Sequence, residues 1–408
     1  MSASSGAFSW NSELPSGRSP FWLTDDALSG LGLHKGDAVS VDTRAEPEDG
    51  DLVVVEAEVE DDSRRIARRY FAVGDRIRLE SIDGATDALE LPETVSLRSA
   101  TIAGTAVEIA FACFDRPSRF DATWLRDHAL DPASRAERRR EPKLWDAGLA
   151  ENLPSQTYDA VASDPRALAR WLRSVRTLGF ALLHSVPTAP GTVCEVVRLF
   201  GYVRETNYGR LFDVVSVEQP HNLAFTAMAL GNHTDNPYRD PVPQLQLLHC
   251  LEAAGEGGES VVVDGFAVAD RLRREAPDAF AILTRTAVPF RYVEMGAVDL
   301  RDAMPLIELD VGGGVRAVRY NNRSIGPLDI DAEDVPAFYA AYRRFARLLH
   351  DPAMTVGFRL KPGDLFIVDN RRVLHGRRGF SGGRRHLQGT YADTDSLLSK
   401  LRVLENDS

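Results

Sequence analysis

The first quarter of the chain alternates between short apolar runs and polar turns. The runs are rich in Val, Ile and aromatic residues, and acidic or Gly-Asp turns separate them. This pattern is typical of short β-strands, so we expect a small all-β module over residues 21–95. The Ser- and Gly-rich residues 1–20 before it are expected to be disordered. The strands of the module are predicted at residues 37–42, 52–60, 64–73 and 76–82.

A second β-rich stretch follows, over residues 96–155. Its apolar runs predict strands at residues 101–112 and 118–125. The next segment, residues 134–143, is dense in Arg and Glu and is interpreted as a solvated loop or helix face. The chain is therefore expected to begin with two small β-rich domains.

Helical periodicity begins after Tyr158. In residues 164–179, Asp164 is placed to cap a helix, Pro165 suits its first position, and Gly179 ends it. The apolar residues of this segment fall on one helical face, at Leu168, Trp171, Leu172 and Val175.

The rest of the chain, residues 156–408, mixes strands with helices and is expected to form the largest domain. A strand is predicted at residues 180–186 and a long helix at residues 334–350. Residues 358–369 are interpreted as a hairpin, because a Pro-Gly turn lies at residues 361–364.

Composition and charge narrow the possible functions. The 408 residues include 48 basic and 60 acidic ones, for a net charge of −12. Such a chain is a poor binder of nucleic acid or anionic membranes, so neither is expected as a partner. No apolar run is long enough to span a membrane, and no signal-peptide pattern is present. Three widely separated cysteines form no disulfide framework, so we expect a cytoplasmic location.

The candidate chemistry lies in three residues. His233 and Asp235 are two apart, so on an extended strand both side chains point to the same face. An HxD pair by itself is also common in surface turns. A distant imidazole, His375, supplies the third ligand that a metal site needs. Two imidazoles and one carboxylate leave three positions open on an octahedral metal, as in non-haem Fe(II) oxygenases.

Arg385 makes the metal interpretation more specific, because it follows His375 by ten residues. A guanidinium can hold a carboxylate through two parallel hydrogen bonds. A 2-oxoglutarate molecule that chelates the same iron needs such a partner for its far carboxylate. Asp369 and Asn370, just before His375, are interpreted as turn residues in the first place, and as partners that orient a metal ligand in the second.

Four long segments resemble the γ-butyrobetaine hydroxylase group of the taurine-dioxygenase-like Fe(II)/2-oxoglutarate oxygenases. The resemblance extends nearly continuously over residues 96–405. The segments are residues 233–266, 319–324, 369–377 and 385–395.

The resemblance implies a mostly β protein with helices. Its catalytic core is expected to be a double-stranded β-helix, or jelly roll, preceded by two small β-rich domains. It implies an enzyme that uses Fe(II), 2-oxoglutarate and O2 to hydroxylate a small quaternary-ammonium zwitterion. The iron ligands are then His233, Asp235 and His375, and Arg385 binds 2-oxoglutarate.

The substrate side chains are also implied by the resemblance. A trimethylammonium group donates no hydrogen bond, so proteins select it with aromatic faces. The family's aromatic cage corresponds to Tyr208, Phe212, Phe225 and Tyr391.

The anionic end of the substrate has several candidate partners, namely Asn321, Asn322 and Arg323. Asn-Asn is equally a turn signal. The substrate alternatives are γ-butyrobetaine, a trimethylaminoethylphosphonate, trimethyllysine and another amino-acid-like molecule. A ligand-sensing regulatory protein without catalysis is the less favoured alternative, because a sensor need not keep the metal ligands together with Arg385.

Two features depart from the related patterns. Many relatives follow the WLRD segment with cysteines that hold zinc, but here only His128 follows it, so we expect no structural zinc.

Residues 35–56 and 64–71 resemble the β-domain of SOS-repressor-type self-cleaving proteins. Ala27 stands at the position of the nucleophilic Ser, and Arg68 at that of the basic Lys. An Arg stays protonated, so this module is expected to be catalytically inactive. The roles left for it are dimerisation, docking, covering the active site or simple stabilisation, and we expect a homodimer.

Overall fold

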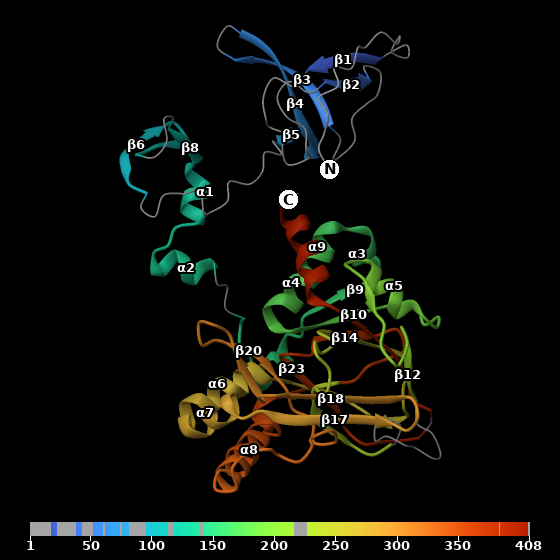
Figure 1. The fold of residues 1–408 in the computed structure, drawn as a ribbon. Helices are drawn as coiled ribbons and strands as arrows, with labels where there is room; N and C mark the ends of the chain where they lie inside the picture. Colours follow the sequence, from blue (N-terminus) through green and yellow to red (C-terminus); the bar gives the residue numbers. More distant parts are fainter. Residues whose placement is uncertain are drawn as a thin grey trace. The chain divides into compact units, whose positions relative to one another are not determined.

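The protein is described here from a computed structural model (Figure 1). The chain divides into two compact units, residues 1–139 and 140–408, and each is described by itself. The structure describes residues 18–22, 38–42, 52–59, 62–73, 76–80, 95–112, 117–138, 142–215, 227–382 and 384–406.

The first unit begins with two small antiparallel sheets. One sheet pairs β1 with β2, and the other has the order β3-β4-β5. These strands confirm the four that the pattern predicts and add one, β1, that it does not indicate. Residues 1–17 lie outside the described part of the chain. The bounds are β1 (Arg18–Trp22), β2 (Ala38–Asp42), β3 (Leu52–Val59), β4 (Asp62–Val73) and β5 (Arg76–Glu80).

A further three-stranded sheet, in the order β6-β7-β8, completes the described part of this unit. The single strand predicted at residues 101–112 is wrong, because the chain turns at Gly104, whose φ is +64°. The strand predicted at residues 118–125 ends early, because the side chain of Asp121 accepts a hydrogen bond from the Trp124 N–H and caps a helix. The bounds are β6 (Leu97–Ala103), β7 (Ala106–Phe111), β8 (Ser118–Asp121), α1 (Ala122–Asp127) and α2 (Pro132–Arg138).

The second unit is a jelly roll of two sheets. The larger sheet has the order β11-β25-β14-β22-β10-β9, and β12 also pairs with β25. The smaller sheet has the order β13-β23-β16-β21. The larger sheet contains β9 (Ser155–Thr157), β10 (Phe180–His184), β11 (Val203–Arg204), β12 (Phe212–Val215), β14 (Leu245–Glu252), β22 (Leu365–Asp369) and β25 (His386–Ala392). The smaller sheet contains β13 (Leu230–His233), β16 (Ser260–Asp264), β21 (Thr355–Phe358) and β23 (Val373–Arg377).

Helices cover the larger sheet and complete one hydrophobic core. The predicted helix at residues 164–179 is confirmed as α4 (Pro165–Leu178), with Asp164 accepting a hydrogen bond from the Arg166 N–H. Gly179 ends it at a φ of +80°. Buried side chains of α4 pack with those of β10, β14 and β22. The other helices of this layer are α3 (Tyr158–Ser163), α5 (Thr192–Arg198) and α9 (Thr394–Asn406).

A second core lies beside the smaller sheet. Buried residues of three helices and of β16, β20 and β23 form it. The predicted helix at residues 334–350 is confirmed as α8 (Val335–Leu349). The other elements here are α6 (Gly265–Glu275), α7 (Pro277–Arg285), β17 (Val288–Glu294), β18 (Val298–Met304), β19 (Ile307–Leu309) and β20 (Val315–Val318).

The hairpin predicted at residues 358–369 is wrong. The turn at residues 361–364 instead connects the two sheets, since β21 pairs with β16 whereas β22 pairs with β10 and β14. Both edges of β22 are occupied, so β21 has no edge of β22 to join. The remaining short elements are η3 (Ala147–Glu151), η5 (Pro352–Met354), β15 (Glu256–Gly257) and β24 (Phe380–Ser381).

None of the helices in the described ranges has the length and apolar character needed to cross a membrane.

Candidate active site

The two imidazoles of the predicted metal site face each other across paired strands. His233 is the last residue of β13, and His375 lies directly opposite it on β23. Directly opposed residues of an antiparallel pair have Cβ atoms about 4.5–5.5 Å apart. The ring centroids are accordingly 4.5 Å apart, and both side chains are buried.

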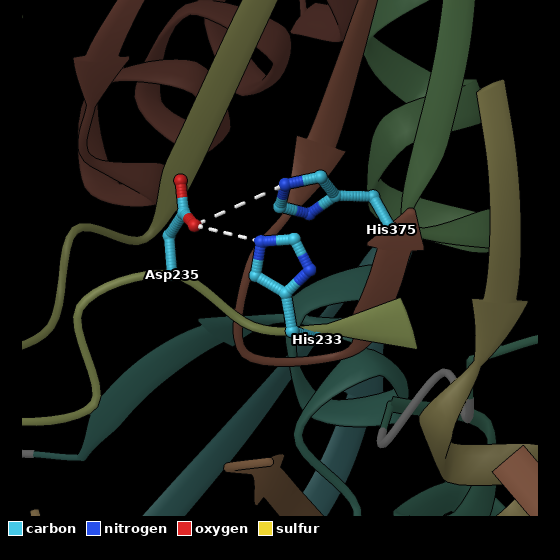
Figure 2. A group of neighbouring side chains, drawn as sticks. All are labelled: His233, Asp235 and His375. Atoms are coloured by element: carbon cyan, nitrogen blue, oxygen red, sulfur yellow. Dashed lines mark ion pairs between the residues drawn. The ribbon is translucent and has the colours of Figure 1, made fainter. Parts of the chain in front are cut away.

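Asp235 completes this group from the loop after β13. Its Oδ1 lies 3.3 Å from Nε2 of His233 and 3.9 Å from Nε2 of His375. Figure 2 shows the carboxylate facing both rings. One donor atom from each residue lies within 4.8 Å of the other two, which is close enough for a single cation to bind all three.

The protonation of the three side chains suits a metal ion. Nδ1 of His233 lies 2.9 Å from the carbonyl oxygen of Gly231, and a proton there leaves Nε2 free to bind a metal. Burial, together with the nearby His233, lowers the pKa of His375 to about 3 and keeps it neutral. Burial alone raises the pKa of Asp235, but hydrogen bonds from its neighbours, Tyr391 among them, outweigh burial and hold the pKa below its usual range. The group offers a carboxylate oxygen and two imidazole nitrogens, a donor set that fits Fe(II) and leaves three positions open.

Asn370 fixes the backbone of Asp235. Its Oδ1 accepts from the Asp235 N–H at 2.7 Å, and its Nδ2 donates to the carbonyl oxygens of Asp235 and Pro243, both at 2.9 Å. The sequence indicates a turn here, with a role beside the metal ligands as the second interpretation. Asn370 lies in a turn and its side chain also holds Asp235. Its contact with Asp235 depends on how the strands are placed, which no local pattern indicates.

A cavity of about 590 Å³ opens beside the three residues, and Arg385 lines it. This arginine comes just before β25 and is only 6% exposed. No acidic side chain in the described ranges forms an ion pair with it. Burial lowers the pKa of Arg385, but a guanidinium remains charged at neutral pH. The cavity therefore contains a buried positive charge that can bind an anion.

Three of the four predicted cage residues line this cavity. The ring of Phe212 lies 5.0 Å from that of Tyr391 and 6.3 Å from that of Tyr208. Phe225 lies outside the described residues. The predicted aromatic residues that the structure describes therefore form one continuous wall.

Two further tyrosines belong to this wall, and the sequence analysis missed both. Tyr238 and Tyr292 line the cavity with ring centroids 5.1 Å apart, and Tyr292 lies 5.9 Å from Tyr208. The hydroxyl oxygens of Tyr208 and Tyr238 are 3.0 Å apart. Tyr238 could have been noticed as an aromatic three residues after Asp235, but nothing local marks Tyr292.

The three residues suggested for the anionic end lie in different places. Asn321 and Arg323 line the cavity, whereas Asn322 does not. Nδ2 of Asn321 donates to the carbonyl oxygen of Thr234, and its Oδ1 accepts from the Arg323 N–H. The side chain of Asn322 instead hydrogen-bonds with the hydroxyls of Tyr320 and Tyr342. Of the two Asn residues, only Asn321 reaches the cavity.

The chain is similar to known dioxygenases over most of its length. Gamma-butyrobetaine dioxygenase of Pseudomonas sp. (strain AK-1) is 40% identical over 321 residues, which cover 78% of this chain and 83% of that protein. The Homo sapiens protein of the same name is 34% identical, covering 70% of this chain and 76% of its own. Trimethyllysine dioxygenase of Meyerozyma guilliermondii is 28% identical, covering 78% and 84%.

Two family models match different parts of the chain. The Peptidase S24-like model matches residues 2–107, which confirms the expected resemblance of the N-terminal module to self-cleaving proteins. The second model, "Taurine catabolism dioxygenase TauD, TfdA family", matches residues 148–391, more than half of the chain. This chain belongs to the TauD, TfdA family and is an Fe(II)- and 2-oxoglutarate-dependent dioxygenase.

Proposed function

We propose that this dioxygenase hydroxylates a short quaternary-ammonium carboxylate, with γ-butyrobetaine as the first candidate. One observation carries the proposal: a wall of aromatic rings lines the same cavity as the His-Asp-His group. The relatives named gamma-butyrobetaine dioxygenase, at 34–40% identity, support the same substrate.

In this proposal His233, Asp235 and His375 hold the iron. Held there, Fe(II) would supply the chemistry that couples O2, as the oxidant, to the oxidation of 2-oxoglutarate to succinate and CO2 and to hydroxylation of the substrate. The protein holds the three donors in place on the paired strands and through Asn370.

Arg385 is proposed to hold the far carboxylate of 2-oxoglutarate. Its burial supports this role, because a charge-assisted hydrogen bond gains strength where water is excluded. The planar guanidinium can also orient the co-substrate through two parallel hydrogen bonds.

The aromatic wall is proposed to bind the trimethylammonium head. Each favourable cation–π contact contributes about 0.5–2 kcal/mol. Tyr208, Phe212 and Tyr391 supply predicted faces, and Tyr238 and Tyr292 extend them. We propose that Phe225 also contributes.

The anionic end of the substrate is proposed to bind Arg323, which lines the cavity and can donate two parallel hydrogen bonds to a carboxylate. Asn321 is proposed to position Arg323. Its Oδ1 accepts from the Arg323 N–H, and its Nδ2 donates to the carbonyl oxygen of Thr234, the residue between His233 and Asp235. A substrate held at both ends presents its middle carbons to the metal.

Succinate release tests the function directly. We expect the purified full-length protein with Fe(II) and 2-oxoglutarate to release succinate with γ-butyrobetaine, and more slowly with trimethyllysine or trimethylaminoethylphosphonate. His375→Ala is expected to retain no turnover, because it removes an iron ligand. Absence of substrate-dependent succinate with all three compounds would contradict the substrate class, and preference for trimethyllysine would replace the first candidate.

We propose three parts for the chain: an inactive S24-like module over residues 21–95, a small β-domain without zinc over residues 96–155, and the oxygenase domain over residues 156–408. The expected replacement of the Ser nucleophile by Ala27 lies outside the described residues. Metal analysis of the purified protein tests the second part, and zinc in a one-to-one ratio with the protein would contradict it.

A homodimer in the cytoplasm is the remaining proposal. The two described cysteines, Cys194 and Cys250, are free thiols, which supports a reducing compartment. The S24-like module is the part of the chain that we propose joins the two copies. Light scattering on the full chain is expected to give twice the mass of 44.9 kDa.

A further inference from the structure

The two oxygens of the Asp235 carboxylate have different neighbours. Oδ1 faces Nε2 of both imidazoles, at 3.3 and 3.9 Å. Oδ2 accepts hydrogen bonds from the Tyr391 hydroxyl, at 2.9 Å, and from Nε2 of Gln246. One oxygen is thus available to a metal and the other is already bound by two donors.

The two donors come from adjacent strands of the other sheet. Gln246 on β14 and Tyr391 on β25 are a directly opposed pair in the larger sheet, so both side chains lie on the same face. Asp235 follows β13 of the smaller sheet. The two hydrogen bonds therefore connect the sheets at the metal site.

Both donors are held firmly in place. Gln246 is 3% exposed and Tyr391 is 4% exposed, so water does not compete for either hydrogen bond. The ring of Phe212 packs 5.0 Å from that of Tyr391. Asn370 fixes the Asp235 backbone from the other side, so the carboxylate has little freedom to rotate.

We infer that Gln246 and Tyr391 are positioning residues that make Asp235 bind the metal through Oδ1 alone. A carboxylate can bind a cation with one oxygen or with two. Binding through both oxygens requires loss of two buried hydrogen bonds and occupies a position that the co-substrate or oxygen needs. This inference rests on the proposed assignment of Asp235 as an iron ligand.

The structure separates two roles of Tyr391. Its hydroxyl holds Asp235, whereas its ring lines the cavity with the other aromatic residues. Tyr391→Phe removes the first role and keeps the aromatic face. Gln246→Leu removes the other donor without touching the aromatic wall.

Anaerobic titration with Co(II), followed by its visible spectrum, tests the inference without any turnover. Loss of a group that orients a metal ligand typically weakens metal binding by about 10- to 100-fold. We expect Tyr391→Phe and Gln246→Leu each to weaken Co(II) binding by about 10-fold or more, and to change the band intensities that report coordination number. The double variant is expected to lose less than the product of the two, because the donors share one oxygen.

Thr390→Val is the matched control. It removes a buried hydroxyl from the neighbouring residue, where Oγ1 donates to the carbonyl oxygen of Arg210 at 2.7 Å, and it leaves Asp235 untouched. We expect the Co(II) affinity and spectrum of the wild-type protein. Wild-type affinity and spectrum in both Tyr391→Phe and Gln246→Leu would overturn the inference.

Asp235→Ala separates this inference from the proposed function. Loss of Co(II) binding in Asp235→Ala supports the ligand assignment, whatever the two positioning variants do. If Asp235→Ala binds Co(II) as the wild type does, the ligand assignment fails, and the inference is overturned with it.

Discussion

Arg385 is the side chain that we propose holds the far carboxylate of 2-oxoglutarate. Its guanidinium is buried in the cavity and no described carboxylate neutralises it. Replacing it with Ala removes a charge-assisted bond pair, and a hydrogen bond to a charged group contributes about 1.5–3 kcal/mol. We therefore expect Arg385→Ala to raise the KM for 2-oxoglutarate about 10- to 100-fold, measured by succinate release at saturating substrate.

The neighbouring arginine provides the control for this prediction. Arg384 is 59% exposed in its side chain and pairs with Glu252 at 3.1 Å. Arg384→Ala is expected to leave the KM for 2-oxoglutarate unchanged. Equal effects of the two variants would mean that general positive charge, and not Arg385 itself, attracts the co-substrate.

At the residue scale, the sequence predicts those side chains whose residue types and spacing are typical of a metal site. His233, Asp235 and His375 come together as expected. Gln246 was not recognised, and Asn370 was interpreted as a turn residue rather than a partner of the metal ligands, because an amide has no characteristic spacing. Their importance comes from the partners that strand pairing gives them, which only the folded chain reveals.

The β17–β18 hairpin is the element that extends the aromatic wall. Its strands pair with each other, and its base is attached by backbone hydrogen bonds from Arg291 to Ser324 and from Gly326 to Pro289, both 2.7 Å. Tyr292 on β17 lines the cavity against Tyr238. The hairpin thus brings an aromatic face to the cavity from outside the two main sheets.

We expect Tyr292→Leu to reduce the preference for a charged substrate head. The measurement is kcat/KM for γ-butyrobetaine, together with its competition by 5,5-dimethylhexanoate. This carboxylate has a neutral tert-butyl head in place of the trimethylammonium group. One cation–π contact of about 0.5–2 kcal/mol corresponds to a loss of about 2- to 30-fold in that preference. Tyr292→Phe keeps the ring face and is expected to retain most of it.

Met295, at the tip of the same hairpin, gives the matched control. It is 95% exposed and does not line the cavity. Met295→Ala is expected to bind both compounds as the wild type does. If Tyr292→Leu also keeps the wild-type preference, Tyr292 is no part of the cation site.

Elements with local signals were predicted best. Caps and periodicity located α4 and α8 closely. The hairpin predicted at residues 358–369 is wrong, because a turn signal does not determine whether the strands on its two sides pair with each other. In a jelly roll, neighbours in sequence often enter different sheets, as β21 and β22 do.

The charge of the whole molecule contrasts with that of its cavity. The chain carries a net charge of −12, yet the cavity is lined by four arginines against three acidic side chains. These are Arg291, Arg323, Arg377 and Arg385, and Asp213, Asp235 and Glu294. An acidic protein attracts the cationic head of the proposed substrate from a distance. The cavity arginines offset the repulsion that the negative net charge exerts on the carboxylates of 2-oxoglutarate and of the proposed substrate.

A buried ion pair holds together distant parts of the oxygenase unit. Arg372 donates to both oxygens of Asp264 at 3.0 and 2.8 Å, and their side chains are 3% and 0% exposed. The same guanidinium donates to the carbonyl oxygens of Thr177, at the end of α4, and of Lys143. Asp264 also accepts from the Trp145 N–H. The pair therefore joins residues 143–145, called the entry segment below, to α4 and to the smaller sheet.

Removing one partner leaves a buried charge without compensation. We expect Asp264→Ala to lower the free energy of unfolding by about 3–5 kcal/mol, measured by urea denaturation with far-UV circular dichroism. Glu195→Ala breaks an exposed pair with Arg198 and is expected to cost about 1 kcal/mol or less. A similar small loss in Asp264→Ala would show that packing of the two cores, and not this pair, holds the entry segment against the jelly roll.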